Sequence, residues 1–132
     1  SERLGIPMAI IDKCRVSDTD VKHGEVVGDV RGRDVVIFED EISTGGTLVS
    51  TVATLKAAGA RSIHAGAVHG VLCGPAIERL RDADIDSVVV TNTVGLPEEK
   101  RLAKITTLSV APLFAAAIER IHGGQSVGAL FE

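Results

Sequence analysis

The sequence contains no tryptophan or tyrosine and only three phenylalanines among its 132 residues. So few aromatic side chains leave no stacking platform for the bases of single-stranded nucleic acid. The formal net charge is −4, whereas proteins that bind nucleic acid or acidic membranes present a basic face. The composition therefore argues against both partners, although a small basic cluster for phosphate groups is compatible with it.

Cysteine and long apolar runs are also scarce. Cys14 and Cys73 are the only cysteines, and they are too far apart to match a metal-binding spacing. Two reduced thiols in a cytoplasmic protein are the default interpretation of this pattern. No apolar run approaches the roughly 18 residues of a membrane span. Neither a P-loop nor a dinucleotide-binding glycine motif is present. We therefore expect a cytoplasmic protein with no metal ligands of its own and no membrane contact.

Short apolar runs alternate with amphipathic stretches along the whole chain. The hydrophobic 45% is mostly small or branched aliphatic residues, which suit strands buried on both faces. The expected strands cover residues 7–11, 25–30, 35–38, 63–68, 88–90 and 105–110, and the expected helices cover 47–58, 74–81 and 112–122. Residues 12–24 are polar and irregular, which favours a mobile functional loop. The alternation predicts a single α/β domain over residues 1–132 with a parallel sheet.

The first residues have the pattern of the last turn of a helix. Residues 1–4 are followed by Gly5, a common helix stop, and then by an expected strand. A chain that begins in this way is expected to lack what preceded it. We therefore expect an N-terminally truncated domain.

The most informative segment follows the apolar run at residues 35–38. Two carboxylates, Glu39 and Asp40, come directly after this run, and Thr44-Gly45-Gly46-Thr47 opens the next helix. Ligands of open parallel sheets bind beyond the carboxyl ends of the strands. Glycines bring backbone N–H groups close to a ligand, and a helix start attracts anions. Carboxylates in turn accept hydrogen bonds from sugar hydroxyls. The segment therefore predicts a phosphorylated-sugar site, with an ordinary strand–helix turn as the alternative.

This run resembles the signature of type I phosphoribosyltransferases and their relatives. In that family the two acids hold the ribose hydroxyls, and the following loop holds the 5-phosphate. The resemblance assigns the first role to Glu39 and Asp40. It assigns phosphate binding to the loop residues Ser43, Thr44, Gly45, Gly46 and Thr47. The implied fold is a parallel, Rossmann-like sheet of the type I phosphoribosyltransferase type.

Other segments are similar to the ribose-phosphate pyrophosphokinase branch, in its C-terminal domain. The run from Ile11 to Arg15 looks like the start of its catalytic flexible loop, and residues 69–76 look like its His-Gly-Val-Leu-Ser-Gly-Pro-Ala segment. The resemblance implies diphosphoryl transfer from Mg-ATP to ribose 5-phosphate, with Lys13 and Arg15 as mobile cations on the transferred group. Magnesium enters with ATP, and its ligands are expected outside this chain. Without the resemblance, both cations would be interpreted as solvated surface residues.

The C-terminal tail and four motif positions complete the comparison with that family. Gln125, Ser126 and Val127 match a tail that lines an allosteric phosphate or ADP site in many members; the alternative is a tail that docks Leu130 and Phe131 on the core. Four positions of these motifs depart from the pattern: Cys14 replaces a cation, Glu39 and Ser43 each replace an aspartate, and Gly45 replaces an alanine or cysteine.

Two other functions stay open at this point. The first is a nucleobase phosphoribosyltransferase, which needs a hood over the base, and no segment is a candidate for one. The second is a non-catalytic regulatory homologue that keeps the fold. Because the ATP-binding part of the family is absent, this chain alone is not expected to turn over. The resemblance also implies assembly into a homo-oligomer.

Overall fold

The computed structural model describes residues 5–15 and 21–131, with the side chains of residues 12–15 and 21–25 left outside the description. The helical turn expected over residues 1–5 lies almost wholly outside the described residues. Within them, no helix is long and apolar enough to cross a membrane.

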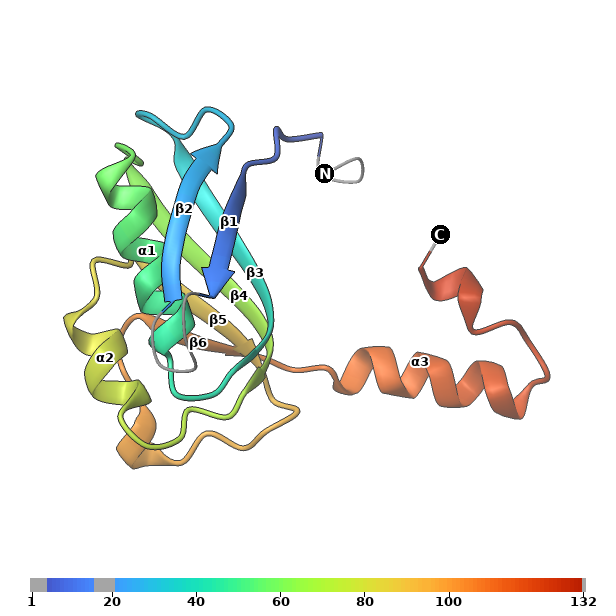
Figure 1. Ribbon diagram of the computed structural model, residues 1–132. Helices are drawn as coiled ribbons and strands as arrows, with labels where there is room; N and C mark the ends of the chain where they lie inside the picture. Colours follow the sequence, from blue (N-terminus) through green and yellow to red (C-terminus); the bar gives the residue numbers. More distant parts are fainter. Residues whose placement is uncertain (1–4, 16–20, 132) are drawn as a thin grey trace.

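A four-stranded parallel sheet forms the centre of the molecule (Figure 1). Its strands are β3 (Asp34–Ile42), β4 (Ser62–Gly70), β5 (Ser87–Thr91) and β6 (Ile105–Leu108), and they lie side by side in that order. Helix α1 (Gly46–Ala57) connects β3 to β4, and α2 (Ala76–Asp82) connects β4 to β5. The parallel pairing confirms the α/β fold class that the alternating sequence pattern predicts.

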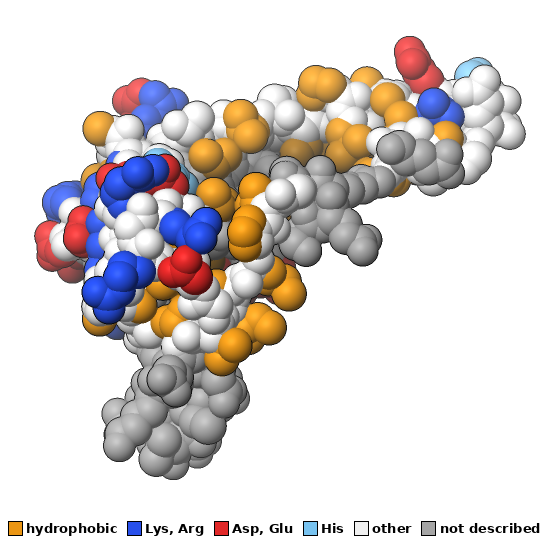
Figure 2. All heavy atoms as spheres, turned by 90° about the horizontal axis from the view of Figure 1, so that it is seen from above, with side chains coloured by type: hydrophobic (Ala, Val, Ile, Leu, Met, Phe, Trp, Pro, Cys, Tyr) orange, Lys and Arg blue, Asp and Glu red, His pale blue; other side chains and the backbone are white. Residues whose placement is uncertain are grey.

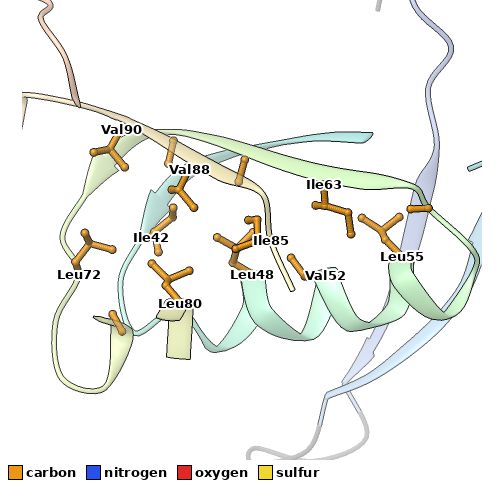
Figure 3. Close-up of a cluster of buried hydrophobic side chains, with 14 of the residues drawn as sticks. Ile42, Leu48, Val52, Leu55, Ile63, Leu72, Leu80, Ile85, Val88 and Val90 are labelled. Carbon is orange, nitrogen blue, oxygen red and sulfur yellow. The ribbon is translucent and has the colours of Figure 1, made fainter. Parts of the chain in front are cut away.

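The hydrophobic core lies between one face of this sheet and the two helices (Figure 3). Alternate strand residues point to this face, as the period of two requires. Ile63 on β4 and Leu80 on α2 are fully buried, and Leu48 and Val52 on α1 close the layer against the sheet. The core therefore holds α1 and α2 against the strands, and with them the loops that precede both helices.

The opposite face of the sheet is open. Val36, Phe38 and Val68 point to it and are exposed, with 69% of Phe38 accessible to solvent. Helix α3 (Ala111–His122) does not cover this face, because it runs away from the sheet and has no buried residue (Figure 1). Two short 3-10 helices, η1 (Glu98–Lys100) and η2 (Gly128–Leu130), complete the described elements. In Figure 2, apolar side chains run along the projecting helix and the adjacent side of the sheet.

Much of the segment expected as a loop at residues 12–24 is strand, so that prediction is wrong. β1 (Ile10–Arg15) and β2 (Val21–Val27) form an antiparallel pair, with residues 16–20 outside the description. The apolar pairs Ile10–Val27 and Ile11–Val26 start the ladder. Backbone hydrogen bonds carry it through the polar residues beyond, because these bonds do not depend on side-chain type.

Strand β3 is also longer than the apolar run that predicts it. Pairing with β4 continues to Ile42 opposite Gly70, so Glu39 and Asp40 lie inside the strand and not after it. The ladder extends because the parallel partner β4 is equally long, and backbone pairing tolerates carboxylates at the strand end. The other helix and strand boundaries differ from the expected ones by a few residues, which is the usual uncertainty of element ends.

Candidate sugar-phosphate site

The loop between β3 and α1 lies at the carboxyl edge of the parallel sheet. Residues 39–48 line a cavity with a volume of about 250 Å³, and they include every residue that the sequence assigns to sugar-phosphate binding. The end of β3 supplies the acidic part of the lining, and the start of α1 supplies the remainder. The structure therefore brings the acids and the Thr-Gly-Gly-Thr loop together at one site.

Several backbone N–H groups of the loop have no partner among the described residues. Within the part of the chain that the structure describes, none of the N–H groups of residues 44–48 donates a backbone or side-chain hydrogen bond. Helical bonding begins only at Val49, whose N–H donates to the carbonyl of Gly45 over 3.0 Å. Gly45 has φ = 74°, a left-handed conformation that favours glycine. Successive N–H groups in such a turn form a concave anion site, and the α1 dipole adds to it.

The two carboxylates occupy different sides of β3. Neighbouring residues of a strand point to opposite faces, and burial agrees: Glu39 is half-buried on the helix side, whereas Asp40 is exposed on the open side. Oδ1 of Asp40 accepts a hydrogen bond from the N–H of Glu41 over 2.8 Å, which orients this carboxylate. Both acids line the same cavity, so together they offer acceptors to hydroxyl groups at two positions of its wall.

The segment that follows β4 holds the β3–α1 loop in place through hydrogen bonds. The N–H of Leu72 donates to the carbonyl of Ile42 over 3.0 Å, and the N–H of Cys73 donates to the carbonyl of Ser43 over the same distance. Sγ of Cys73 also lies 3.3 Å from Oγ of Ser43, within hydrogen-bonding distance. Leu72 adopts a positive φ of 47°, which is uncommon for a residue with a Cβ, and its side chain is nearly fully buried. The segment thus fixes two consecutive carbonyls of the loop.

Arg79 on α2 bonds to the third carbonyl, that of Thr44. Its Nη1 donates to this oxygen over 3.0 Å. No motif in the sequence singles out this arginine. The signal that could have found it is topological: β3 and β4 are parallel neighbours, so the segments that follow them meet at the same edge of the sheet.

The remaining predicted functional residues are not placed in this site by the described structure. Lys13 and Arg15 belong to β1, and their side chains lie outside the description. Gln125, Ser126 and Val127 follow α3 on the far side of the molecule from the β3–α1 loop, where the carbonyl of Ser126 accepts a hydrogen bond from Arg120 (Figure 1). Neither Leu130 nor Phe131 is among the apolar residues packed against the core in the described structure, and Phe131 is half-exposed.

His69 lies at the same carboxyl edge as the loop, one strand further along. Its Nδ1 is 2.9 Å from Oγ1 of Thr93, and the Thr93 hydroxyl donates to the carbonyl of Val68 over 3.0 Å. These bonds tie the end of β4 to the segment after β5. These contacts give His69 a structural role at the sheet edge.

The pronounced electrostatic effects lie at the opposite, amino edge of the sheet. Hydrogen bonds from Arg61 and Ser62 hold the pKa of Asp34 well below its usual range, and the N–H of Ile63 lowers the pKa of Asp86 by bonding to its carboxylate. These groups tie the strand starts together and lie away from the cavity. They are therefore structural contacts.

The described residues contain no group of three or more histidine, cysteine or acidic side chains that could hold a metal ion. Magnesium commonly needs only one or two protein carboxylates together with phosphate oxygens of the substrate. The acidic side chains of the described residues do not by themselves form a metal centre. We therefore assign no metal ligand to the described part of the chain.

The parallel sheet, the paired acids and the Thr-Gly-Gly-Thr loop define an α/β domain of the type I phosphoribosyltransferase class. Residues 7–132 match the sequence model of the family described as the phosphoribosyl synthetase-associated domain, and the chain belongs to this family. The prediction of the ribose-phosphate pyrophosphokinase family is thereby confirmed.

Named relatives agree with this assignment. The chain is 50% identical to a ribose-phosphate pyrophosphokinase of Caldanaerobacter subterraneus subsp. tengcongensis over 99% of its own length and 42% of the relative's. It is 47% identical to the enzyme of that name from Rhodopirellula baltica, with the same coverage. A crystal structure of phosphoribosylpyrophosphate synthetase from Mycobacterium smegmatis matches with a TM-score of 0.84 and 39% identity, over 93% of this chain and 39% of that one. The chain thus spans about two-fifths of the length of these relatives.

Proposed function

We propose that this chain is the ribose 5-phosphate-binding part of a ribose-phosphate pyrophosphokinase. The observation that carries the proposal is the row of unpartnered N–H groups at residues 44–48 beside Glu39 and Asp40, in one cavity. The N–H groups suit the phosphate monoester, and the carboxylates suit the ribose hydroxyls. The names of the relatives supply the reaction: transfer of a diphosphoryl group to the sugar.

In this proposal the residues of the chain bind and orient the acceptor sugar. The loop anchors the 5-phosphate and the acids anchor the hydroxyls, so the position of the anomeric hydroxyl is fixed. A fixed acceptor lowers the entropic cost of bringing the two reactants together. Mg-ATP supplies the transferred group. Catalysis of phosphoryl transfer depends on positioning and on neutralising charge. Lys13 and Arg15 are proposed to provide part of that charge, because both are cations on β1.

Calorimetric titration with ribose 5-phosphate tests the binding role. Ribose and inorganic phosphate serve as separate probes for the two halves of the cavity. We expect ribose 5-phosphate to bind more tightly than either probe, because only this ligand uses both halves. Equal affinity for ribose 5-phosphate and inorganic phosphate would leave the acids without a role and contradict the proposal.

The catalytic role of Lys13 needs a protein that also binds ATP. In a full-length pyrophosphokinase that carries this domain, we expect Lys13→Ala to lower turnover far more than ribose 5-phosphate affinity. An unchanged turnover would remove Lys13 from the mechanism. Binding of phosphoribosyl pyrophosphate in preference to ribose 5-phosphate would favour a phosphoribosyltransferase, and absence of turnover in the full-length protein would favour a regulatory homologue.

A further inference from the structure

Arg79 lies directly against the phosphate loop. Its Nη1 donates to the carbonyl of Thr44 over 3.0 Å, and a Cβ added to Gly46 would lie 3.2 Å from the same nitrogen. The second glycine of the Thr-Gly-Gly-Thr motif therefore leaves room for this guanidinium. Gly46 does not need its glycine for a left-handed conformation, since only Gly45 has a positive φ in this motif.

The bond to Thr44 determines which way one peptide of the loop faces. In a planar trans peptide, the carbonyl of one residue and the N–H of the next point in opposite directions. With its carbonyl held by Arg79, the Thr44–Gly45 peptide directs the N–H of Gly45 away from the guanidinium. This N–H is one of the unpartnered donors of the loop. A cationic donor on the carbonyl also polarises the peptide, which makes its N–H a stronger donor.

Arg79 also brings charge to a site that is otherwise acidic. Glu39, Asp40 and Glu41 follow one another at the end of β3. Among the described residues, Arg79 is the only lysine or arginine whose side chain hydrogen-bonds to loop residues 43–47, and it forms no ion pair with a carboxylate there. A guanidinium has five N–H donors. Within the described part of the chain, no carboxylate neutralises the charge of Arg79.

We propose that Arg79 is a positioning residue of the sugar-phosphate site, which holds the Thr44–Gly45 peptide in its anion-binding orientation and sets the preference for the dianionic phosphate group. This inference rests on the proposed function. The inference adds to the proposed function by assigning the phosphate preference to a residue of α2, outside the binding motif.

Arg81 offers a matched control on the same helix. It lies two residues further along α2, is exposed and carries the same charge, and its side chain has no hydrogen bond within the described structure. Arg81→Gln therefore changes the net charge as Arg79→Gln does, without touching the loop. Arg79→Lys keeps the charge but replaces the planar five-donor guanidinium by an ammonium with three donors.

The test is calorimetric titration of the 132-residue chain and these three variants with ribose 5-phosphate and with ribose. Arg79→Gln is expected to weaken ribose 5-phosphate binding about tenfold, the size of a lost hydrogen bond to a charged group, and to change ribose binding less than about twofold. Arg79→Lys is expected to recover part of the loss, and Arg81→Gln to match the unaltered chain.

A pH series separates positioning of the anion site from general support of the fold. The second ionisation of a phosphate monoester lies near pH 6, so affinity of the unaltered chain is expected to rise from pH 5 to pH 8, and that of Arg79→Gln to rise less. Equal affinities in Arg79→Gln and Arg81→Gln, or equal proportional losses for ribose and ribose 5-phosphate, would overturn the inference alone. Failure of the folded, unaltered chain to bind ribose 5-phosphate would instead overturn the proposed function and this inference with it.

Discussion

The two faces of the parallel sheet are built by alternate residues of the same strands, yet they have different surroundings. On the face toward α1 and α2, Ile63 and Val88 are fully buried. On the other face, Phe38 and Val68 are comparably apolar and stay exposed. Burial therefore follows from the two helices and not from hydrophobicity alone. Most of the candidate site is held by the covered side, since α1 begins in the Thr-Gly-Gly-Thr loop and the segment leading into α2 bonds to this loop, whereas Asp40 reaches the same cavity from the open side.

Truncating one apolar residue on each side of the sheet gives the largest expected contrast. Leu80→Ala should lower the free energy of unfolding by about 2–5 kcal/mol, because it leaves a cavity in a packed layer. Phe38→Ala should change it by no more than about 0.5 kcal/mol, because most of this ring is already in water. Denaturant unfolding measures both. Similar losses at the two positions would show that the open face is covered in solution.

Adding a methyl group tests the same packed face by overfilling it, whereas the truncation leaves a cavity. A Cβ on Gly70 would lie 2.9 Å from Cβ of Val90, a contact that requires one of the two strands to move. Gly70→Ala is expected to cost about 1–3 kcal/mol in the free energy of unfolding, as overpacking usually does. Gly95→Ala is the control, since nothing lies within 4 Å of its added Cβ. A neutral Gly70→Ala would mean that the carboxyl end of the sheet is loosely packed.

The acid dependence of stability should originate at the amino edge of the sheet, where Asp34 bonds to Arg61 and Ser62. Its pKa is lowered in the folded chain from an ordinary value of 3.8. The ionised form therefore stabilises the fold above about that pH, and the contribution is lost as the pH falls further. Asp34→Asn should flatten the fall in melting temperature between pH 5 and pH 2. Asp82→Asn, at an exposed residue of α2, should retain it.

The smallest expected effect concerns Thr51 on the buried side of α1. Its Oγ1 is buried and has no hydrogen-bond partner within the described residues. Thr51→Val removes this hydroxyl with little change of shape and should raise the free energy of unfolding by up to about 1 kcal/mol. Thermal unfolding measures it. A loss above about 1 kcal/mol would reveal a partner for this hydroxyl.

Local sequence signals predicted the parts of the molecule that depend on local chemistry. The apolar runs predicted the strands of the parallel sheet, and the Thr-Gly-Gly-Thr run predicted a glycine turn at the start of α1. The left-handed conformation of Gly45 is a finding of the structure. The position of the acids and the loop in one cavity follows from a general property of parallel sheets, whose ligands bind at the carboxyl edge.

Features that depend on distant partners could not be predicted in the same way. The β1–β2 pair forms through backbone ladders across polar residues, which leave no periodic hydrophobic signal. Arg79 reaches the loop from 35 residues away in the sequence, through the packing of α2. The exposure of α3 could not be predicted from the sequence either, because its apolar residues Phe114 and Ile118 would also suit a helix packed on the sheet.

The most direct test of the central claim is amide NMR of the isotope-labelled chain during titration with ribose 5-phosphate. The account predicts that the amide shifts concentrate at residues 44–48 and at Glu39 and Asp40, while Val36, Phe38 and Val68 on the open face remain unchanged. Shifts confined to the open face or to α3, with the loop unaffected, would show that the sugar phosphate binds elsewhere and would contradict the account.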